Sequence, residues 1–206
     1  MKKTNNSYAP AIVLAVVGVF VIAGIYVANK TNDTASGGQA GAGGGGALLS
    51  IDDLVGKPAP KFSLSDRNGT EYSLENLKGK NVVLFFNEGI MCYPGCWNQV
   101  ASLGKDARFN GGDTLAFSVV VDQPNDWAKA IQKMPELESA KLLFDTSRSA
   151  SRAYAMLTAN SSMHFGSLPG HTYVVIDKAG IVRYVYDDPR MAINNELITA
   201  EVEKLE

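Results

Sequence analysis

Apolar residues form short runs along the second half of the chain, and these runs predict the strands of a sheet. Three continuous apolar runs have the length and pattern of strands buried on both faces. An alternating run, IVRYVY, follows a glycine turn and predicts a strand paired with the one before it. Residues 61–74 predict a further hairpin, because Asn68-Gly69 is a strong turn signal between two short strands. The four other predicted strands are NVVLFF (81–86), TLAFSVVV (114–121), TYVVID (172–177) and IVRYVY (181–186).

Helical spacing of apolar residues marks the stretches between these strands. In the predicted helix of residues 125–134, Asn125 or Asp126 is a candidate N-cap residue. The order of elements is then β-hairpin, β, α, β, α, β, α, β, β, α. Strands that alternate with helices predict an α/β fold with a central mixed sheet flanked by helices. The predicted helices cover residues 94–109, 125–134, 147–157 and 194–206.

The N-terminal region has a different pattern. Residues 9–28, APAIVLAVVGVFVIAGIYVA, carry no charge, and a helix of this length spans about 30 Å, the thickness of a bilayer core. We therefore expect a transmembrane anchor within residues 1–30; a cleaved signal peptide is the alternative, although its apolar region is usually shorter. Two lysines precede the span and one follows it closely, which predicts a cytoplasmic N-terminus and an extracytoplasmic domain. The expected location is a single-pass position in the cell membrane.

Residues 31–50 predict a flexible linker. The segment ASGGQAGAGGGG (35–46) has seven glycines in twelve positions, so it cannot bury apolar area. Residues 51–206 then form the globular domain.

Composition limits the classes of function. The chain has 19 basic and 21 acidic side chains, and this balance argues against a nucleic-acid-binding protein. Two cysteines exclude a disulfide-dense scaffold and a four-cysteine zinc site. No glycine-rich phosphate loop follows a predicted strand, and no bound cofactor is expected.

The two cysteines carry the candidate chemistry. Cys92 and Cys96 lie in FFNEGIMCYPGCWNQV, directly after a buried strand and at the start of a helix whose first turn suits Pro94. A helix N-terminus favours the thiolate, which is both the nucleophile and the metal ligand. Four residues across a turn can bring the two Cα atoms within disulfide range, about 4.4–6.8 Å. The placement predicts redox or metal chemistry; a structural disulfide and two inert thiols are the alternatives.

Three phrases of the domain resemble the peroxiredoxin-like redoxins, the alkyl hydroperoxide reductase/thiol-specific antioxidant group of the thioredoxin superfamily. They are VGKPAPKFSLSDRNGTEYSLENLKGKNVVLFF, FSVVVDQPNDWAKAI and GHTYVVIDKAGIVRYVY. The resemblance implies a thioredoxin-like fold with the reactive cysteine at the N-terminus of the first long helix.

The chain departs from this family at positions that matter for peroxide chemistry. With Cys96 on the peroxide-reactive cysteine, Gly89 and Tyr93 stand where the family has Pro and Thr or Ser. His171 stands where it has Arg, and there an imidazolium would support the thiolate only below its pKa near 6.5. These departures weigh against efficient peroxidase activity.

A second resemblance accommodates the departures. Sco-type copper chaperones are similar in having the same fold, one N-terminal anchor, a C-x-x-x-C pair and a distant His. Cys92, Cys96 and His171 match that set, and two thiolates with an imidazole suit Cu(I). Trp97 stands where those proteins have Pro.

Neighbouring side chains are expected to be structural. Met91 is expected to fill the core, Trp97 to pack the helix, and Glu88 to be a surface carboxylate or else a proton relay. Met163 and His164 lie in a Ser- and Gly-rich segment that predicts a solvated loop near the site.

The leading hypothesis is a membrane-anchored thiol–disulfide oxidoreductase or peroxidase that uses Cys92, Cys96 and His171. Its partners would be a protein thiol or disulfide client or a peroxide, together with an electron donor. A Cu(I) chaperone that uses the same three residues is the competing hypothesis, and an inert interaction domain ranks last.

Overall fold

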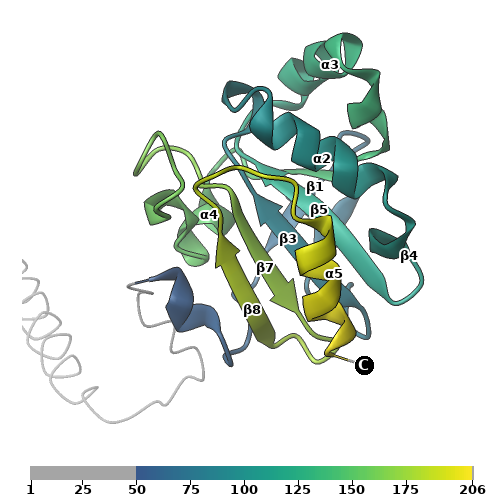
Figure 1. Cartoon of the computed structure of the whole chain (residues 1–206), viewed down its shortest axis with the longest axis vertical. Coiled ribbons are helices and arrows are strands. Elements are labelled where there is room, and N and C mark those ends of the chain that lie inside the picture. The colour runs from purple at the N-terminus through teal and green to yellow at the C-terminus, as the bar shows by residue number, and fades with distance from the viewer. Residues whose placement is uncertain (1–49, 206) are drawn as a thin grey trace, which may run out of the picture. The chain divides into compact units, whose positions relative to one another are not determined.

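A mixed sheet with the strand order β2-β1-β6-β5-β3-β7-β8 is the centre of the computed structural model, which describes residues 50–205 (Figure 1). Strands β3, β5 and β6 are parallel, while β7 and β8 continue the sheet antiparallel on one side and β1 and β2 on the other. The short strand β4 pairs with β5 outside this path. The strands are β1 (Ser63–Ser65), β2 (Glu71–Ser73), β3 (Asn81–Phe86), β4 (Asn110–Gly111), β5 (Thr114–Val120), β6 (Leu142–Phe144), β7 (Thr172–Ile176) and β8 (Val182–Asp187).

Alternating side chains of the central strands bury two separate cores, one on each face of the sheet. In β3, Val83 and Phe85 face a core shared with Trp97, Trp127 and other helix residues. The intervening side chains of β3 face a second core closed by the 3₁₀ turn of residues 51–54 and the α4 region. Both faces are covered, which is why β3 is buried throughout and apolar from Val82 to Phe86.

Within residues 50–205, four α-helices and five 3₁₀ turns surround the sheet, and α2 and α5 cross its first face (Figure 1). The helices are α2 (Gly95–Lys105), α3 (Pro124–Lys133), α4 (Ser149–Ala153) and α5 (Asn195–Glu203). The 3₁₀ turns are η1 (Ile51–Leu54), η2 (Gly89–Met91), η3 (Ala107–Phe109), η4 (Pro135–Ser139) and η5 (Met156–Thr158).

The predicted α/β architecture with a mixed sheet is confirmed. The hairpin of residues 61–74 forms as β1 and β2, with Gly69 at φ +80° in its turn. The strand between the second and third helices, expected in the order but not assigned to residues, is β6.

The helix boundaries required correction. The first predicted helix ends at Lys105, because Asp106 adopts an extended conformation before η3 begins. Helix α3 starts one residue earlier than predicted, with Gln123 at the cap position and Pro124 in the first turn, so neither predicted cap is used. The third predicted helix is divided into α4 and η5, because Ala155 has a positive φ of 57°.

The proposed membrane anchor (1–30) and residues 31–49 of the linker lie outside the described residues. Among residues 50–205, no helix is long and apolar enough to cross a bilayer.

Candidate functional site

The candidate site lies at one edge of the sheet, where several strand ends meet. Phe86, the last residue of β3, pairs with Thr172, the first residue of β7, and Thr172 pairs in turn with Asp187 at the end of β8. The carboxyl end of β5 reaches the same edge, because Phe86 also pairs with Val119. Open α/β sheets place ligands and reactive groups at such carboxyl ends.

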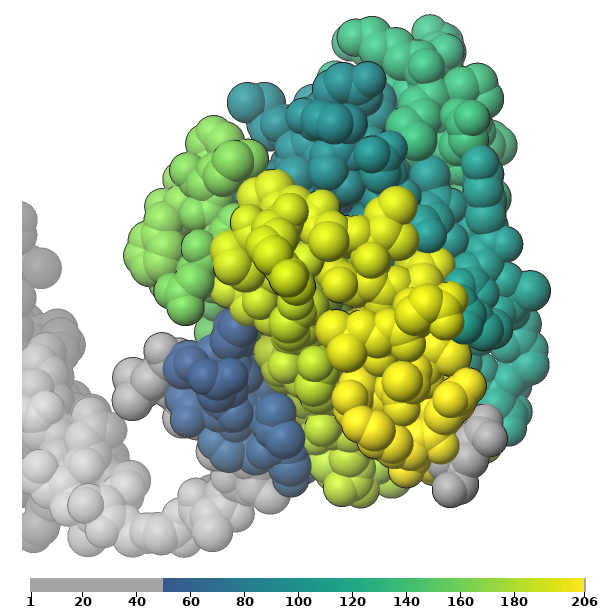
Figure 2. All heavy atoms as spheres, viewed as in Figure 1, coloured from purple at the N-terminus to yellow at the C-terminus, as the bar shows by residue number. Residues whose placement is uncertain are grey.

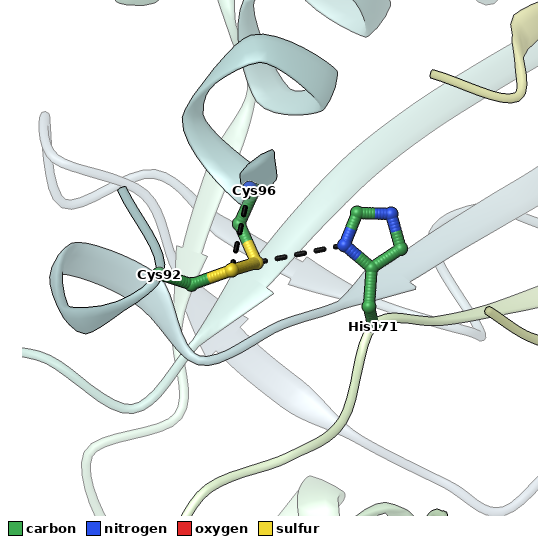
Figure 3. A group of neighbouring side chains, drawn as sticks. All are labelled: Cys92, Cys96 and His171. Carbon is green, nitrogen blue, oxygen red and sulfur yellow. Dashed lines mark hydrogen bonds between the residues drawn. A yellow bond between two sulfur atoms is a disulfide. The ribbon is translucent and has the colours of Figure 1, made fainter. Parts of the chain in front are cut away.

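Cys92 and Cys96 form a disulfide at the start of α2, with their Cα atoms 5.3 Å apart (Figure 3). Cys92 lies in the segment between η2 and α2, and Cys96 lies in the first turn of α2. The backbone N–H of Cys96 donates to the carbonyl oxygen of Cys92 at 3.0 Å and also lies 3.3 Å from Cys92 Sγ. The predicted positions and separation of the pair are confirmed.

His171 immediately precedes β7, and its Nδ1 atom lies 3.5 Å from Cys96 Sγ (Figure 3). On the other side of the ring, Nε2 lies 3.2 Å from the carbonyl oxygen of Ala192 and 3.0 Å from the hydroxyl of Tyr173. Because a carbonyl can only accept, the contact with Ala192 places the proton on Nε2. The lone pair of Nδ1 then faces the sulfur of Cys96.

Burial determines the charge of this imidazole. His171 is fully buried, with its ring 4.6 Å from the ring of Phe85, and burial lowers the pKa of His171 to about 4, although Asp188 opposes the shift. With the disulfide closed, His171 is therefore neutral at pH 7. The expectation of a cation that titrates near pH 6.5 does not hold in this state, because desolvation penalises the charged ring.

A tight turn after β8 covers the other side of the disulfide. The carboxylate of buried Asp188 accepts hydrogen bonds from the backbone N–H groups of Arg190 and Ala192, at 3.1 and 3.0 Å. Met191 has a φ of 53°, and its Sδ atom lies 3.5 Å from Cys92 Sγ. This turn therefore places the Met191 thioether beside Cys92. It also places the Ala192 carbonyl against His171, whose other ring nitrogen lies beside Cys96.

The segment before Cys92 is held by Asp122, which follows β5. Its Oδ2 atom accepts from the N–H of Ile90 at 3.2 Å and from the indole N–H of Trp127 at 3.0 Å. Gly89 has a φ of 64°, and a Cβ atom there would lie 1.7 Å from Asp122 Oδ2. This close approach and the positive φ explain the glycine at this position.

The loop of residues 161–168 is attached to the same edge by a buried carboxylate. Glu88 is fully buried, and its Oε1 atom accepts from the N–H groups of Met163 at 2.6 Å and His164 at 3.0 Å, while Oε2 lies 3.2 Å from His164 Nδ1. The prediction of a surface carboxylate at Glu88 is wrong, because the loop folds over it. The prediction of a solvated loop is confirmed for Met163 and His164, which are both exposed; Met163 is 61% exposed, and the neighbouring Phe165 is 66% exposed.

Two further expectations for single side chains have opposite outcomes. Trp97 packs in the core as predicted, and its indole N–H donates to the carbonyl of Gly89 at 3.3 Å. Met91 does not fill the core; it is 60% exposed beside Cys92.

Asp188, Met191 and Tyr173 are parts of the site that no sequence pattern indicated. The sequence Asp187-Asp188-Pro189 at the end of a predicted strand is a signal for a turn, but nothing local places that turn against the cysteines.

The fold and the site together define a thioredoxin-like redoxin. AhpC from Enterococcus faecalis has a similar structure, with a TM-score of 0.61 and 16% sequence identity over 73% of this chain and 92% of that one. BcpB from Mycobacterium tuberculosis matches with a TM-score of 0.58 and 22% identity over 74% of this chain and 98% of that one. Likeness at these identities shows the fold.

Residues 55–185 match the AhpC/TSA family, and the chain belongs to that family. Peroxiredoxin Bcp of Escherichia coli (strain K12) is 28% identical over 154 residues, which are 70% of this chain and 92% of that one. A chloroplastic peroxiredoxin Q of Triticum aestivum is 32% identical over 135 residues, which are 65% of this chain and 58% of that one. The sequence-based recognition of a peroxiredoxin-like redoxin is confirmed.

Proposed function

We propose that this protein is a membrane-anchored, extracytoplasmic thiol–disulfide oxidoreductase of the AhpC/TSA family. The observation that carries the proposal is the Cys92–Cys96 disulfide at the start of α2, with the Nδ1 lone pair of His171 directed at Cys96 Sγ. In the proposed reaction cycle, the Cys92–Cys96 pair alternates between disulfide and dithiol. It does so by exchange with the thiol or disulfide of a partner, or by reduction of a peroxide.

The two cysteines have different roles in this proposal. Cys92 is the sulfur that exchanges with the partner, since it keeps 3% exposure while Cys96 has none. Cys96 is the resolving thiol: His171 Nδ1 takes its proton, and the resulting thiolate attacks Cys92 Sγ in the mixed disulfide and releases the partner's thiolate. With a hydroperoxide, a Cys96 thiolate would form the sulfenic acid and release the alcohol, and Cys92 would then close the disulfide with loss of water.

Single cysteine variants test the cycle. Cys92→Ser and Cys96→Ser should each abolish turnover in a disulfide-exchange assay. Cys96→Ser should additionally accumulate a mixed disulfide at Cys92, because nothing resolves it. The proposal is wrong if both variants retain full activity toward disulfides and peroxides.

The membrane location rests on the sequence pattern. It is supported by the uncharged run of residues 9–28, the lysine bias across it and the glycine-rich segment after it. A reporter fused after residue 206 should be active outside the cytoplasm, and the mature protein should retain its first residues. A mature chain that begins after residue 30 would replace the anchor with a signal peptide and leave the redox proposal unchanged.

Copper binding is a second candidate function, and a specific observation favours it. The sulfur atoms of Cys92 and Cys96 and a ring nitrogen of His171 all lie within 4.8 Å of one another, and the Met191 thioether adjoins Cys92 Sγ. Once reduced, this set offers two thiolates, an imidazole nitrogen and a thioether, which are the donors that suit Cu(I). Anaerobic titration of the reduced protein against a chromogenic Cu(I) chelator tests this function. His171→Arg should weaken binding at least tenfold, because Arg offers no lone pair; an unchanged affinity would exclude the imidazole as a ligand.

A further inference from the structure

We propose that Met191 is a site of reversible oxidation, and that its sulfoxide is a substrate of the Cys92–Cys96 pair. The oxidant is a hydroperoxide, which converts the Met191 thioether to the sulfoxide, and the reduced pair then converts the sulfoxide back to methionine. This inference rests on the proposed dithiol–disulfide cycle and adds methionine sulfoxide to the substrates of the pair.

The thioether of Met191 adjoins the sulfur that is proposed to attack substrates. Its Sδ atom lies 3.5 Å from Cys92 Sγ, a separation from which two groups held in place can react. Figure 2 shows the segment after β8, which carries Met191, directly beside the α2 region on one face of the molecule. A thiolate at Cys92 is therefore within reach of the sulfur atom of a Met191 sulfoxide.

The backbone around Met191 holds the thioether in this place through contacts that do not involve the disulfide. The N–H of Met191 donates to the carbonyl of Asp188 at 3.0 Å. The Asp188 carboxylate accepts from the N–H groups of Arg190 and Ala192, the residues on either side. Met191 adopts a φ of 53°, which is uncommon for a residue with a side chain and persists only where surrounding contacts impose it. Opening the disulfide should thus leave the thioether beside Cys92.

The start of α2 leaves room for this side chain. A Cβ atom on Gly95 would lie only 3.2 Å from Met191 Cβ, so a larger residue there would crowd the methionine. The glycine therefore allows Met191 to pack against the helix that carries Cys96.

The two neighbouring sulfur atoms differ in their access to solvent. Cys92 is 3% exposed, whereas Met191 is partly exposed. A small oxidant that approaches from solvent therefore meets the thioether before it meets Cys92. Oxidation of a methionine to its sulfoxide is reversible, provided that a reductant reaches the sulfoxide. At Met191, the cysteine pair is that reductant.

The reaction balances with the hydroperoxide and the cysteine pair alone. The hydroperoxide transfers one oxygen atom to Met191 Sδ and leaves as an alcohol. The Cys92 thiol then takes this oxygen: the sulfoxide S–O bond breaks, methionine is regenerated, and Cys92 becomes a sulfenic acid. Cys96 attacks Cys92 Sγ, the disulfide forms, and the hydroxyl group leaves as water with the proton of Cys96. Two electrons pass from the pair to the sulfoxide.

Peptide mass spectrometry of the full-length protein in detergent micelles tests the inference. Hydrogen peroxide is added to the disulfide form, in which both cysteines are protected, and is then removed. The pair is opened with a phosphine at about pH 5, the phosphine is removed under argon, and the pH is raised to about 8 so that more of Cys92 is thiolate.

The fraction of Met191 that carries oxygen should fall at least twofold after the pH is raised, and two thiols should be lost for each oxygen. Half of the sulfoxide can remain, because a sulfoxide has two epimers and a fixed thiolate needs to reach only one of them.

Two other methionines are internal controls in the same sample. Met134 is partly exposed at the end of α3, and Met163 is 61% exposed. Both should retain their oxygen after the pair is opened. Cys92→Ser is the matched variant, and in it Met191 should also retain its oxygen, because the attacking thiol is absent.

Three outcomes would overturn the inference: Met191 gains no oxygen under conditions that oxidise Met163, Met191 keeps its oxygen in the reduced wild type, or Met191 loses oxygen equally in Cys92→Ser. Oxidised glutathione, given to the same reduced protein, separates this inference from the proposed function. A protein that reduces glutathione and leaves the Met191 sulfoxide intact refutes the inference alone. A protein that exchanges with no disulfide refutes the proposed function itself.

Discussion

The buried imidazole of His171 should make the stability of the oxidised protein depend on pH in a defined direction. Burial lowers the pKa of His171 from 6.5 to about 4, so the unfolded chain binds a proton between these values that the folded chain does not. The contribution of neutral His171 to stability is thus fully present above pH 6.5 and is lost as the pH falls toward 4. The whole shift corresponds to about 3 kcal/mol, of which about 2 kcal/mol should be lost between pH 7.5 and pH 5.

Urea unfolding of the oxidised protein, measured at intervals from pH 7.5 to pH 5, gives this contribution. The matched variant is His171→Asn, which removes the titrating group and retains a polar side chain at the site. The free energy of unfolding of the wild type should fall by about 2 kcal/mol more than that of the variant over this range.

The difference between the two curves isolates His171, because the carboxylates titrate in both proteins. Parallel curves would refute the argument, since they would mean that His171 protonates equally in the folded and unfolded chains. A wild type that gains stability as the pH falls would show that a nearby negative charge dominates the ring in place of burial.

Two further predictions concern the segments on either side of the cysteines. Gly89→Ala should reduce the free energy of unfolding by about 2–4 kcal/mol, because it combines a left-handed φ with a clash against Asp122. The control is Gly112→Ala, which has a similar φ of 60° but open space around it. This variant should lose only about 1 kcal/mol in the same urea measurement. Equal losses would contradict the clash. Glu88→Ala should speed amide exchange of Met163 at least tenfold, measured by hydrogen–deuterium exchange, because it removes the acceptor of this N–H group; the effect on His164 should be smaller, because its N–H also donates to Ser162 Oγ. Unchanged exchange would mean that the loop is held by other contacts.

The local pattern of residues was sufficient to predict the central strands and the position of the Cys92–Cys96 pair. The apolar run of residues 81–86 has to be buried on both faces, and the sequence after it places Pro94 and Cys96 at a helix start. Both features depend on residues a few positions apart, so the sequence alone could predict them. The chain's membership of a redoxin family was likewise recognisable from contiguous phrases.

The short elements and the helix limits were less predictable. Strand β6 has three residues, too few for a pattern of its own, and it exists because it pairs with β5 and β1. The break between α4 and η5 depends on the positive φ of Ala155, a residue that ordinarily favours helix.

The available chemistry can be read from the sequence: two cysteines at the start of one helix and a histidine before a distant strand. The state of these groups depends on the folded structure, because the pKa and the tautomer of the histidine depend on burial and on partners far along the chain. The carbonyl of Ala192 directs the Nδ1 lone pair of His171 toward Cys96, and the surrounding core makes the ring neutral. Met191 meets Cys92 across 99 positions of sequence, and Glu88 becomes a buried anchor because a loop 75 residues later folds over it. Contacts over such separations depend on how segments far apart in the sequence pack together, which no local pattern of residues specifies.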